Sequence, residues 1–202
     1  MTARSVRPTL DAALGVLHRV RRDADIVVTT MVPARVWMEL GAGPRDLVLV
    51  PSAMGHATSF GLGLALAQPQ RRVIVCNGDG SMLMNLGALV SITAAAPANL
   101  VLIVFDNGVY EVTGSQPTPG AAPGRGGAAG VDFAAMARAS GFPSVFHFSE
   151  LAEWTRDVDA VLRAPGPTFV AIDVTSIPGT PGPRSPGPAG ERAKKFIAAL
   201  TS

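Results

Sequence analysis

Two uninterrupted apolar runs in the middle of the chain constrain its fold more than any other feature. The runs cover residues 73–76 and 100–105, and the segment between them has apolar residues at helical spacing. A strand that is apolar at every position is typical of a parallel sheet buried on both faces, and parallel neighbours need a long, usually helical, crossover. The segment therefore predicts a strand, helix and strand unit inside the protein.

The same alternation continues along the 202 residues. Apolar runs of strand length alternate with segments of helical spacing, which is the pattern of an α/β protein. We expect a doubly wound, mainly parallel six-stranded sheet with helices on both faces. The expected strands are residues 25–30, 47–50, 73–76, 100–105, 145–148 and 168–174, and the expected helices cover residues 8–22, 33–40, a segment ending near 68, 81–95, 132–140, a segment starting at 149, and 191–200.

The chain is long enough for one sizeable domain, which we place at residues 1–176. Residues 177–190 are rich in Pro and Gly and are typical of a linker. Residues 191–202 form a short C-terminal helix with Phe196, Ile197 and Leu200 on one side. The pattern leaves two places for this helix, on a partner protein or folded back on its own domain.

The helix that follows the turn near residue 52 is made of small residues. Gly61, Gly63 and Ala65 could suggest a dinucleotide-binding fingerprint, but they lie inside the helix rather than in the turn before it. We therefore interpret these positions as sites of close helix packing.

The composition excludes several classes of protein. Hydrophobic residues make up 48% of the chain, the formal net charge is +2, and no basic stripe with interleaved aromatic residues predicts nucleic-acid binding. The single cysteine, Cys76, lies in an apolar run and fits a reducing compartment. No apolar run is long enough to span a membrane, and charged residues and a proline interrupt the N-terminal segment where a signal peptide would lie. We expect a cytoplasmic protein that binds neither membranes nor nucleic acids.

Polar turns follow three of the expected strands, at residues 52–56, 78–81 and 106–110. Because the carboxyl ends of parallel strands share one edge of the sheet, Asp79 and Asn107 can converge although 28 positions separate them. One carboxylate and one amide oxygen suit a hydrated magnesium ion that holds a phosphate group. A helix that starts at Ser81 offers free backbone N–H groups to a diphosphate. The turns therefore predict a site for a magnesium-bound diphosphate.

These turns resemble the signature of the thiamine-diphosphate enzyme superfamily, Gly-Asp-Gly followed after about 25–30 residues by Asn-Asn or Asp-Asn. Gly78, Asp79 and Gly80 match the first part, and Asp106 and Asn107 match the second. The segments PSAMGHATSFGLGLALA, GDGSMLMNLGAL and DNGVYEVTGSQPT are similar to the diphosphate-binding half of the sulfopyruvate and phosphonopyruvate decarboxylases. The resemblance implies the thiamine-diphosphate-binding fold and the cofactors thiamine diphosphate and Mg²⁺.

The resemblance also assigns roles to single residues. Asp79, the Asn107 side chain and the backbone carbonyl of Val109 would bind magnesium, and Met54 would prop the cofactor in a V shape. The chain has Ser-Ala-Met-Gly from residue 52, where the family usually has Gly-Ser-Met-Gly. Further contacts with the cofactor would come from Ser52, Ala53, Gly78, Gly80, Ser81 and Tyr110.

Residues beside the turns are candidates for contacts with reacting groups. His56 could move protons at the substrate or cap the helix that follows it. Glu111 is a catalytic candidate because it follows the magnesium turn, and Thr113 and Gln116 match a Thr-Gly-Gly-Gln run of the family and are substrate candidates. Arg125 could close over an anionic group or remain solvated.

The resemblance implies that the chain is half of an enzyme. In the family a glutamate of a separate pyrimidine-binding domain activates the cofactor, and no glutamate of this sequence matches it. We expect a separate pyrimidine-binding, alpha-type subunit in a heterodimer or heterotetramer. The expected activity is decarboxylation of a small 2-oxo acid. Carboligation of the acetolactate synthase type and a noncatalytic regulatory subunit are the alternatives.

Overall fold

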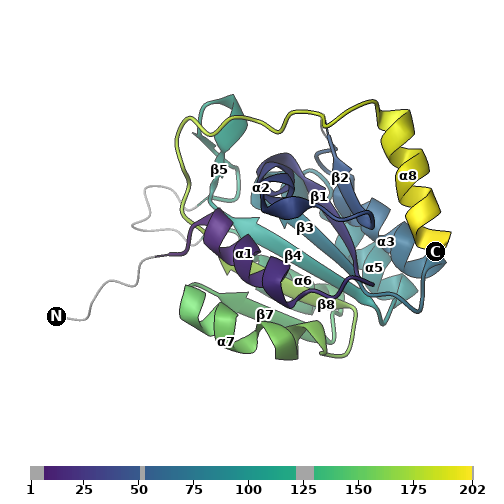
Figure 1. The fold of residues 1–202 in the computed structure, drawn as a ribbon. Coiled ribbons are helices and arrows are strands. Elements are labelled where there is room, and N and C mark those ends of the chain that lie inside the picture. Colours follow the sequence, from purple (N-terminus) through teal and green to yellow (C-terminus); the bar gives the residue numbers. More distant parts are fainter. Residues whose placement is uncertain (1–6, 51–52, 122–129, 202) are drawn as a thin grey trace.

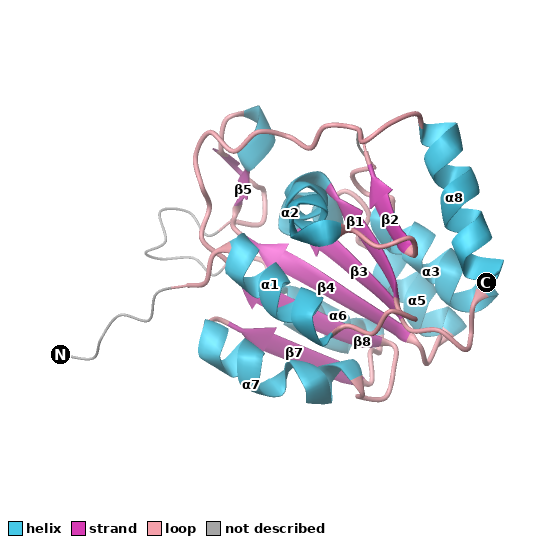
Figure 2. Cartoon of the chain, in the orientation of Figure 1, coloured by secondary structure: helices cyan, strands magenta, loops and turns pink. Residues whose placement is uncertain are grey.

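The computed structural model describes residues 7–50, 53–121 and 130–201. Its centre is one six-stranded sheet in which all neighbouring strands run parallel, in the order β2-β1-β3-β4-β8-β7 (Figure 1). Helices cover both faces of this sheet (Figure 2), so the fold class expected from the sequence is confirmed. The strands of the sheet are β1 (Ile26–Thr30), β2 (Asp46–Leu49), β3 (Val73–Gly78), β4 (Leu100–Asp106), β7 (Ser144–Phe148) and β8 (Thr168–Asp173).

Each face of the sheet carries its own hydrophobic core. Along β3, Ile74 and Cys76 belong to one core, and Val73 and Val75 belong to the other, because successive side chains of a strand point to opposite faces. The first core is covered by α1 (Leu10–Val20), α2 (Met31–Gly41) and α7 (Leu151–Leu162), and the second by α3 (Ala57–Ala67), α5 (Gly87–Ala95) and α6 (Phe133–Ser140).

Several helix ends follow local sequence signals. The hydroxyl of Thr9 accepts a hydrogen bond from the backbone N–H of Ala12, which makes Thr9 the N-cap of α1. Asp132 caps α6 in the same way through Ala135. The helix ends at Gly141, whose φ of 99° is a left-handed conformation that glycine adopts without strain. The expected helix over residues 132–140 therefore begins and ends close to where the sequence places it.

One long helix expected over residues 81–95 is wrong, because the structure has α4 (Asp79–Leu83) and α5 with a turn between them. In this turn Asn85 donates from its side chain to the Gly55 carbonyl and to the Ser59 hydroxyl. Its backbone N–H bonds to the carbonyl of Met82, three residues back, which is a tighter turn than an α-helix. The contact with a distant turn ends the helix, and periodicity alone gives no sign of it.

The helix expected to begin at Pro33 starts two residues earlier, at Met31. Pro33 lies in the first turn of α2, where its missing N–H leaves no helical hydrogen bond unmade. Met31 has a φ of 55°, which is uncommon for a residue with a side chain and marks a constrained corner at the end of β1.

The segment after β4 begins with regular structure. A two-stranded hairpin pairs β5 (Val109–Tyr110) with β6 (Gln116–Pro117), and a single 3-10 turn, η1 (Glu111–Thr113), lies between the two strands. Residues 122–129, which include Arg125, are outside the described part of the chain.

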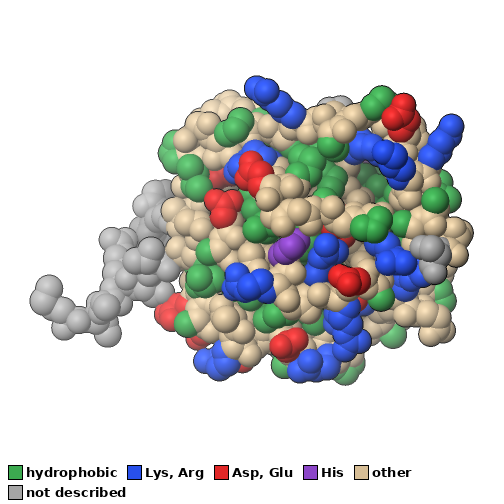
Figure 3. Space-filling view, in the orientation of Figure 1, with side chains coloured by type: hydrophobic (Ala, Val, Ile, Leu, Met, Phe, Trp, Pro, Cys, Tyr) green, Lys and Arg blue, Asp and Glu red, His purple; other side chains and the backbone are tan. Residues whose placement is uncertain are grey.

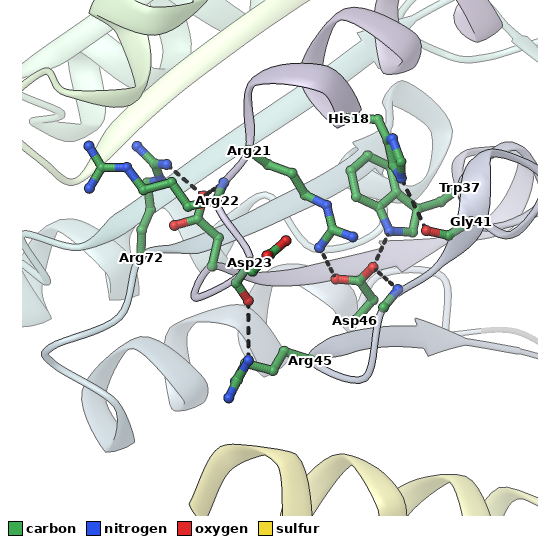
Figure 4. A network of polar contacts seen from close by, with 11 residues as sticks. His18, Arg21, Arg22, Asp23, Trp37, Gly41, Arg45, Asp46 and Arg72 are labelled. Carbon is green, nitrogen blue, oxygen red and sulfur yellow. Dashed lines mark hydrogen bonds and ion pairs between the residues drawn. The ribbon is translucent and has the colours of Figure 1, made fainter. Parts of the chain in front are cut away.

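Polar contacts tie the helices of one face to the sheet (Figure 4). The Arg21 guanidinium donates to Asp46, which also accepts from the Trp37 indole N–H at 2.8 Å. His18 bonds through Nε2 to the Gly41 carbonyl at 3.1 Å. The basic end of α1 is therefore partly used in packing α1, α2 and β2 together. Acidic and basic side chains are interspersed over the face seen in Figure 3.

The C-terminal strap, which we define as residues 175–188, leaves the sheet after β8 and crosses above its carboxyl edge to α8 (Ala189–Thr201) (Figure 1). The sequence allowed α8 to lie on a partner protein or on its own domain, and in the structure it lies on its own domain. Phe196 is buried in the core that α3 covers, and Leu200 packs against that core. None of the helices in the described ranges is long and apolar enough to cross a membrane.

Candidate functional site

The three turns predicted to converge line one cavity of about 80 Å³ at the carboxyl edge of the sheet. The first turn contributes Met54 and the second contributes Asp79. The third turn contributes Asn107 and Val109. Further lining residues are Leu10, Met31, Val32, Pro33, Gly78, Gly80, Ser81, Phe105, Tyr110, Glu111, Val112, Thr113 and Val174.

The first turn is fastened to the second by side chains. The Ser81 hydroxyl accepts a hydrogen bond from the backbone N–H of Gly55 at 3.1 Å, and Asn85 donates to the Gly55 carbonyl at 2.8 Å. Gly55 has a φ of 77°, which a glycine adopts at little cost. These contacts fix the backbone on which Met54 sits. Ser52 lies outside the described residues, and Ala53 precedes Met54 in the same turn.

Asp79 presents a buried carboxylate to the cavity. Its exposed fraction is 3%, and its Oδ2 accepts a hydrogen bond from the Thr118 hydroxyl at 3.1 Å. Burial, and then the negative charge of Asp106, raises the pKa of Asp79 to about 7. None of the described residues that line this cavity is cationic. The cavity therefore favours a bound cation that would keep the carboxylate ionised.

The third turn brings Asn107 into the lining of the same cavity. Asn107 Oδ1 accepts from the backbone N–H of Val109 at 2.9 Å, and Asp106 accepts from Gly108 at 3.0 Å. Gly108 has a φ of 73°, and its carbonyl accepts from the backbone N–H of Thr118 at 2.9 Å. Thr118 thus joins the second and third turns, which sequence reasoning did not anticipate because the residue lies beyond the hairpin.

The two glycines of the second turn differ in their surroundings. A Cβ at Gly80 would lie 2.4 Å from Cε1 of Tyr110, so only glycine lets that ring lie against the turn. A Cβ at Gly78 would meet no atom within 4 Å. Gly78 therefore leaves open space beside Asp79.

Glu111 lies in the cavity wall with an exposed fraction of 8%. Its Oε1 accepts a hydrogen bond from the backbone N–H of Ile177 in the C-terminal strap at 2.7 Å. Thr113 also lines the cavity, whereas Gln116 is exposed and donates to the Thr113 carbonyl at 2.8 Å. Of the two substrate candidates, only Thr113 contributes to the cavity wall.

His56 lies just outside the cavity lining. Its Nδ1 bonds to the Met54 carbonyl at 2.9 Å, and because a carbonyl only accepts, Nδ1 carries the proton. His56 occupies the N-cap position of α3, as considered from the sequence, but its side chain makes no capping bond. The ring instead braces the turn that carries Met54.

A second, larger cavity of about 550 Å³ adjoins the third turn. His147 Nε2 bonds to Asp173 at 3.0 Å, and this bond, more than the partial burial that opposes it, raises the pKa of His147. Asp173 also pairs with Arg7 at 3.2 Å. Sequence reasoning gave no sign of this cavity, because its walls come from β4, β7, β8 and α6.

The sequence matches the family described as thiamine pyrophosphate enzyme, C-terminal TPP binding domain, over residues 25–172. It is 38% identical to phosphonopyruvate decarboxylase of Streptomyces viridochromogenes over 96% of this chain and 47% of that protein. It is 37% identical to sulfopyruvate decarboxylase subunit beta of Methanothermobacter thermautotrophicus over 77% of this chain and 76% of that subunit.

The fold also matches a solved structure from Mycobacterium smegmatis with a TM-score of 0.67 and 21% identity, over 86% of this chain and 33% of the other. The chain spans about half the length of the Streptomyces protein. The match to the family covers most of the sheet and all three turns. The chain belongs to the thiamine pyrophosphate enzyme family and carries its C-terminal TPP binding domain.

Proposed function

We propose that this chain is the diphosphate-binding subunit of a split, magnesium-dependent thiamine-diphosphate enzyme that decarboxylates a small 2-oxo acid. The observation that carries the proposal is the buried Asp79 carboxylate, which faces a cavity beside Asn107 with no cationic side chain among the described lining residues. The relatives named phosphonopyruvate decarboxylase and sulfopyruvate decarboxylase subunit beta support the choice of reaction.

The residues of the cavity fit a magnesium ion and a diphosphate. No cluster of three or more His, Cys, Asp or Glu that could hold a metal occurs in the described ranges, so a cation here would rely on Asp79, the Asn107 amide oxygen and the Val109 carbonyl. Magnesium commonly binds through one or two carboxylates, waters and the phosphates of its ligand. The open space at Gly78 and the backbone of Gly80 and Ser81 would accommodate the diphosphate.

Thiamine diphosphate, when bound, supplies a thiazolium ring that takes up the electrons released as carbon dioxide leaves. The protein contributes position and environment. Met54 would support the middle of the cofactor on a turn that Ser81, Asn85 and His56 hold in place. The apolar side chains of the cavity wall, such as Val32 and Val112, would exclude water from the reacting groups.

A separate pyrimidine-binding subunit is part of the proposal. No glutamate of this chain matches the one that the family uses to activate the cofactor, and Glu111 is bonded to the strap. The relatives named subunit beta support a partner.

The outer faces of α3 and α5 also support a partner. Phe60 and Leu66 of α3, Val90 of α5 and Met84 of the turn before α5 are 51–61% exposed. Residues 47–70 and 80–105 contain no Asp, Glu, Lys or Arg. Depletion of charge with exposed large apolar side chains is typical of the centre of an interface. A cytoplasmic location is proposed because the single cysteine, Cys76, is a buried free thiol.

Reconstitution tests the proposal. The chain is purified with and without the pyrimidine-binding subunit of the same organism, and carbon dioxide release from sulfopyruvate and phosphonopyruvate is measured with magnesium and thiamine diphosphate. We expect release only from the pair. Full turnover by the chain alone would contradict the split arrangement, and formation of a ketol in place of an aldehyde would favour carboligation.

A further inference from the structure

The C-terminal strap and α8 lie outside the part of the chain that matches the family, which ends at residue 172. The strap crosses above the carboxyl edge of the sheet, where the cofactor cavity lies (Figures 1 and 2). It begins at Thr175, whose backbone N–H donates to the Pro8 carbonyl at 2.9 Å. Two further anchors hold it, and both join it to segments that form the cofactor site.

The first anchor is Glu111 in the cavity wall. Its Oε1 accepts from the Ile177 N–H at 2.7 Å, and Thr180 turns the strap by donating its hydroxyl to the Ile177 carbonyl at 2.6 Å. A Cβ at Gly182 would lie 3.0 Å from Val112, so the strap also packs closely on the residue after Glu111. A carboxylate engaged in this way joins the cavity wall to the strap.

The second anchor is Arg192 in the first turn of α8. Its guanidinium donates to three backbone carbonyls, those of Val48 at 2.7 Å, Val50 at 2.6 Å and Gly187 at 3.2 Å. Charge-assisted bonds of this kind are stronger than those between neutral groups. Val50 directly follows β2 and precedes the turn of Met54 in the chain. Arg192 therefore fixes the point from which that turn departs.

We propose that Glu111 and Arg192 are positioning residues, which hold the C-terminal strap along the carboxyl edge of the sheet and thereby fix the third turn and the approach to the first. The proposal rests on the function proposed above, in which the cavity binds magnesium and thiamine diphosphate. It assigns Glu111 a role that needs an acceptor oxygen but no ionisable group. Glutamine keeps that oxygen and alanine does not, so the pair Glu111→Gln and Glu111→Ala separates anchoring from acid and base catalysis.

The anchoring is measured first, on the chain without cofactor. Arg184 lies exposed in the middle of the strap and offers a trypsin site, and the fragment cut after it is followed by mass spectrometry. We expect Glu111→Ala and Arg192→Ala to be cut about tenfold faster than the wild type, because each loses a hydrogen bond to a charged group. Glu111→Gln and the control Lys195→Ala, on the exposed side of α8, are expected within about twofold of the wild type.

The reconstituted pair is then titrated with thiamine diphosphate and magnesium. We expect Glu111→Ala and Arg192→Ala to weaken cofactor binding about tenfold or more, and Glu111→Gln to keep wild-type binding and kcat. Loss of kcat in Glu111→Gln with an intact strap would overturn the proposal, because it would make Glu111 an acid or base. Unchanged cleavage in both alanine variants would overturn it as well. A wild-type pair that binds no cofactor would contradict the proposed function, while the cleavage rates would still decide whether the two residues anchor the strap.

Discussion

The buried position of Asp79 makes an ionised carboxylate there unfavourable for the stability of the chain without a bound cation. It is 3% exposed, and the nearby charge that affects it most is the negative charge of Asp106. An ionised group buried without a cation destabilises the fold, and the proposed binding of magnesium would remove that cost. Stability and function therefore make opposite demands on this residue.

Asp79→Asn separates the two demands. In magnesium-free buffer at pH 8 we expect the free energy of unfolding to equal that of the wild type or exceed it by up to about 2 kcal/mol, because the amide carries no charge to bury. Thermal protection by magnesium and thiamine diphosphate is expected to disappear. Asp159→Asn on α7, where the side chain is 62% exposed, is the control and is expected to change neither quantity appreciably. Retained protection in Asp79→Asn would contradict the assignment.

His147 gives a pH-dependent prediction. Its pKa is raised, chiefly by the bond to Asp173, so the pair stabilises the fold below the ordinary histidine value of about 6.5, and the gain is lost as the pH rises through the folded-state pKa. Because the side chain is 49% exposed, the effect is under about 1 kcal/mol. We expect His147→Gln to destabilise the protein in urea unfolding at pH 6 but not at pH 9. An equal loss at both values would show that charge is not involved.

Sequence reasoning located the turns of the site better than the roles of single side chains. Asp79 and Asn107 line one cavity because both closely follow buried parallel strands, a relation that the apolar runs make visible. The partner of Glu111 is Ile177, 66 positions away, and no local pattern links the two. The bond of His56 to the Met54 carbonyl is local, but it depends on the shape of a turn rather than on residue type.

Among the elements, α3 shows how closely helices approach the sheet. A Cβ at Gly61 would lie 2.1 Å from Cγ2 of Val75 in β3, so the glycine there permits close packing, as the sequence suggests. Gly63, two positions later, would meet nothing within 4 Å. The same interpretation is therefore right for Gly61 and wrong for Gly63 within this chain.

These two glycines form a matched pair of variants. We expect Gly61→Ala to cost about 1–3 kcal/mol, since Val75 is fully buried and cannot move aside freely. Gly63→Ala is expected to stabilise the chain by up to about 1 kcal/mol, because alanine favours the helix and meets no obstacle. Urea midpoints of the two variants measure both effects, and equal shifts would contradict the packing of α3 on β3.

The strands were predictable as elements because each is a nearly continuous apolar run. All six fall within two residues of their expected ends, and β1, β3, β4 and β8 are buried at nearly every position. The break between α4 and α5 was not predictable. It depends on the contact of Asn85 with Gly55, and the apolar spacing of residues 81–95 continues through it.

At the scale of the whole molecule, the rate at which a reagent labels the single cysteine measures how often the sheet opens. Cys76 is fully buried in β3, and burial raises the pKa of its thiol. We expect a thiol reagent to label it at least about a thousandfold more slowly in buffer than in urea, because access requires the sheet to open. In the reconstituted pair, magnesium and thiamine diphosphate are expected to slow labelling further, since they bind the folded state alone. Rapid labelling in buffer would contradict the burial of β3.

The order of the strands belongs to the whole molecule and was not evident from the sequence. Local patterns identify strands and crossovers, but the order β2-β1-β3-β4-β8-β7 depends on which strand each crossover returns to. The contacts of α8 likewise could not be inferred from local sequence patterns. Its apolar side allowed either a partner or the domain, and the bonds of Arg192 to the end of β2 settle the choice in this chain.

The C-terminal strap also sets an order of events during synthesis of the protein. Every strand of the sheet precedes residue 174, whereas Arg192 follows its partner Val48 by 144 positions. The sheet can therefore pair before the C-terminal strap and α8 leave the ribosome, and the anchors of Glu111 and Arg192 form only after both have emerged. We expect a nascent chain to hold a folded sheet with a loosely held carboxyl edge until the C-terminal strap and α8 have left the ribosome.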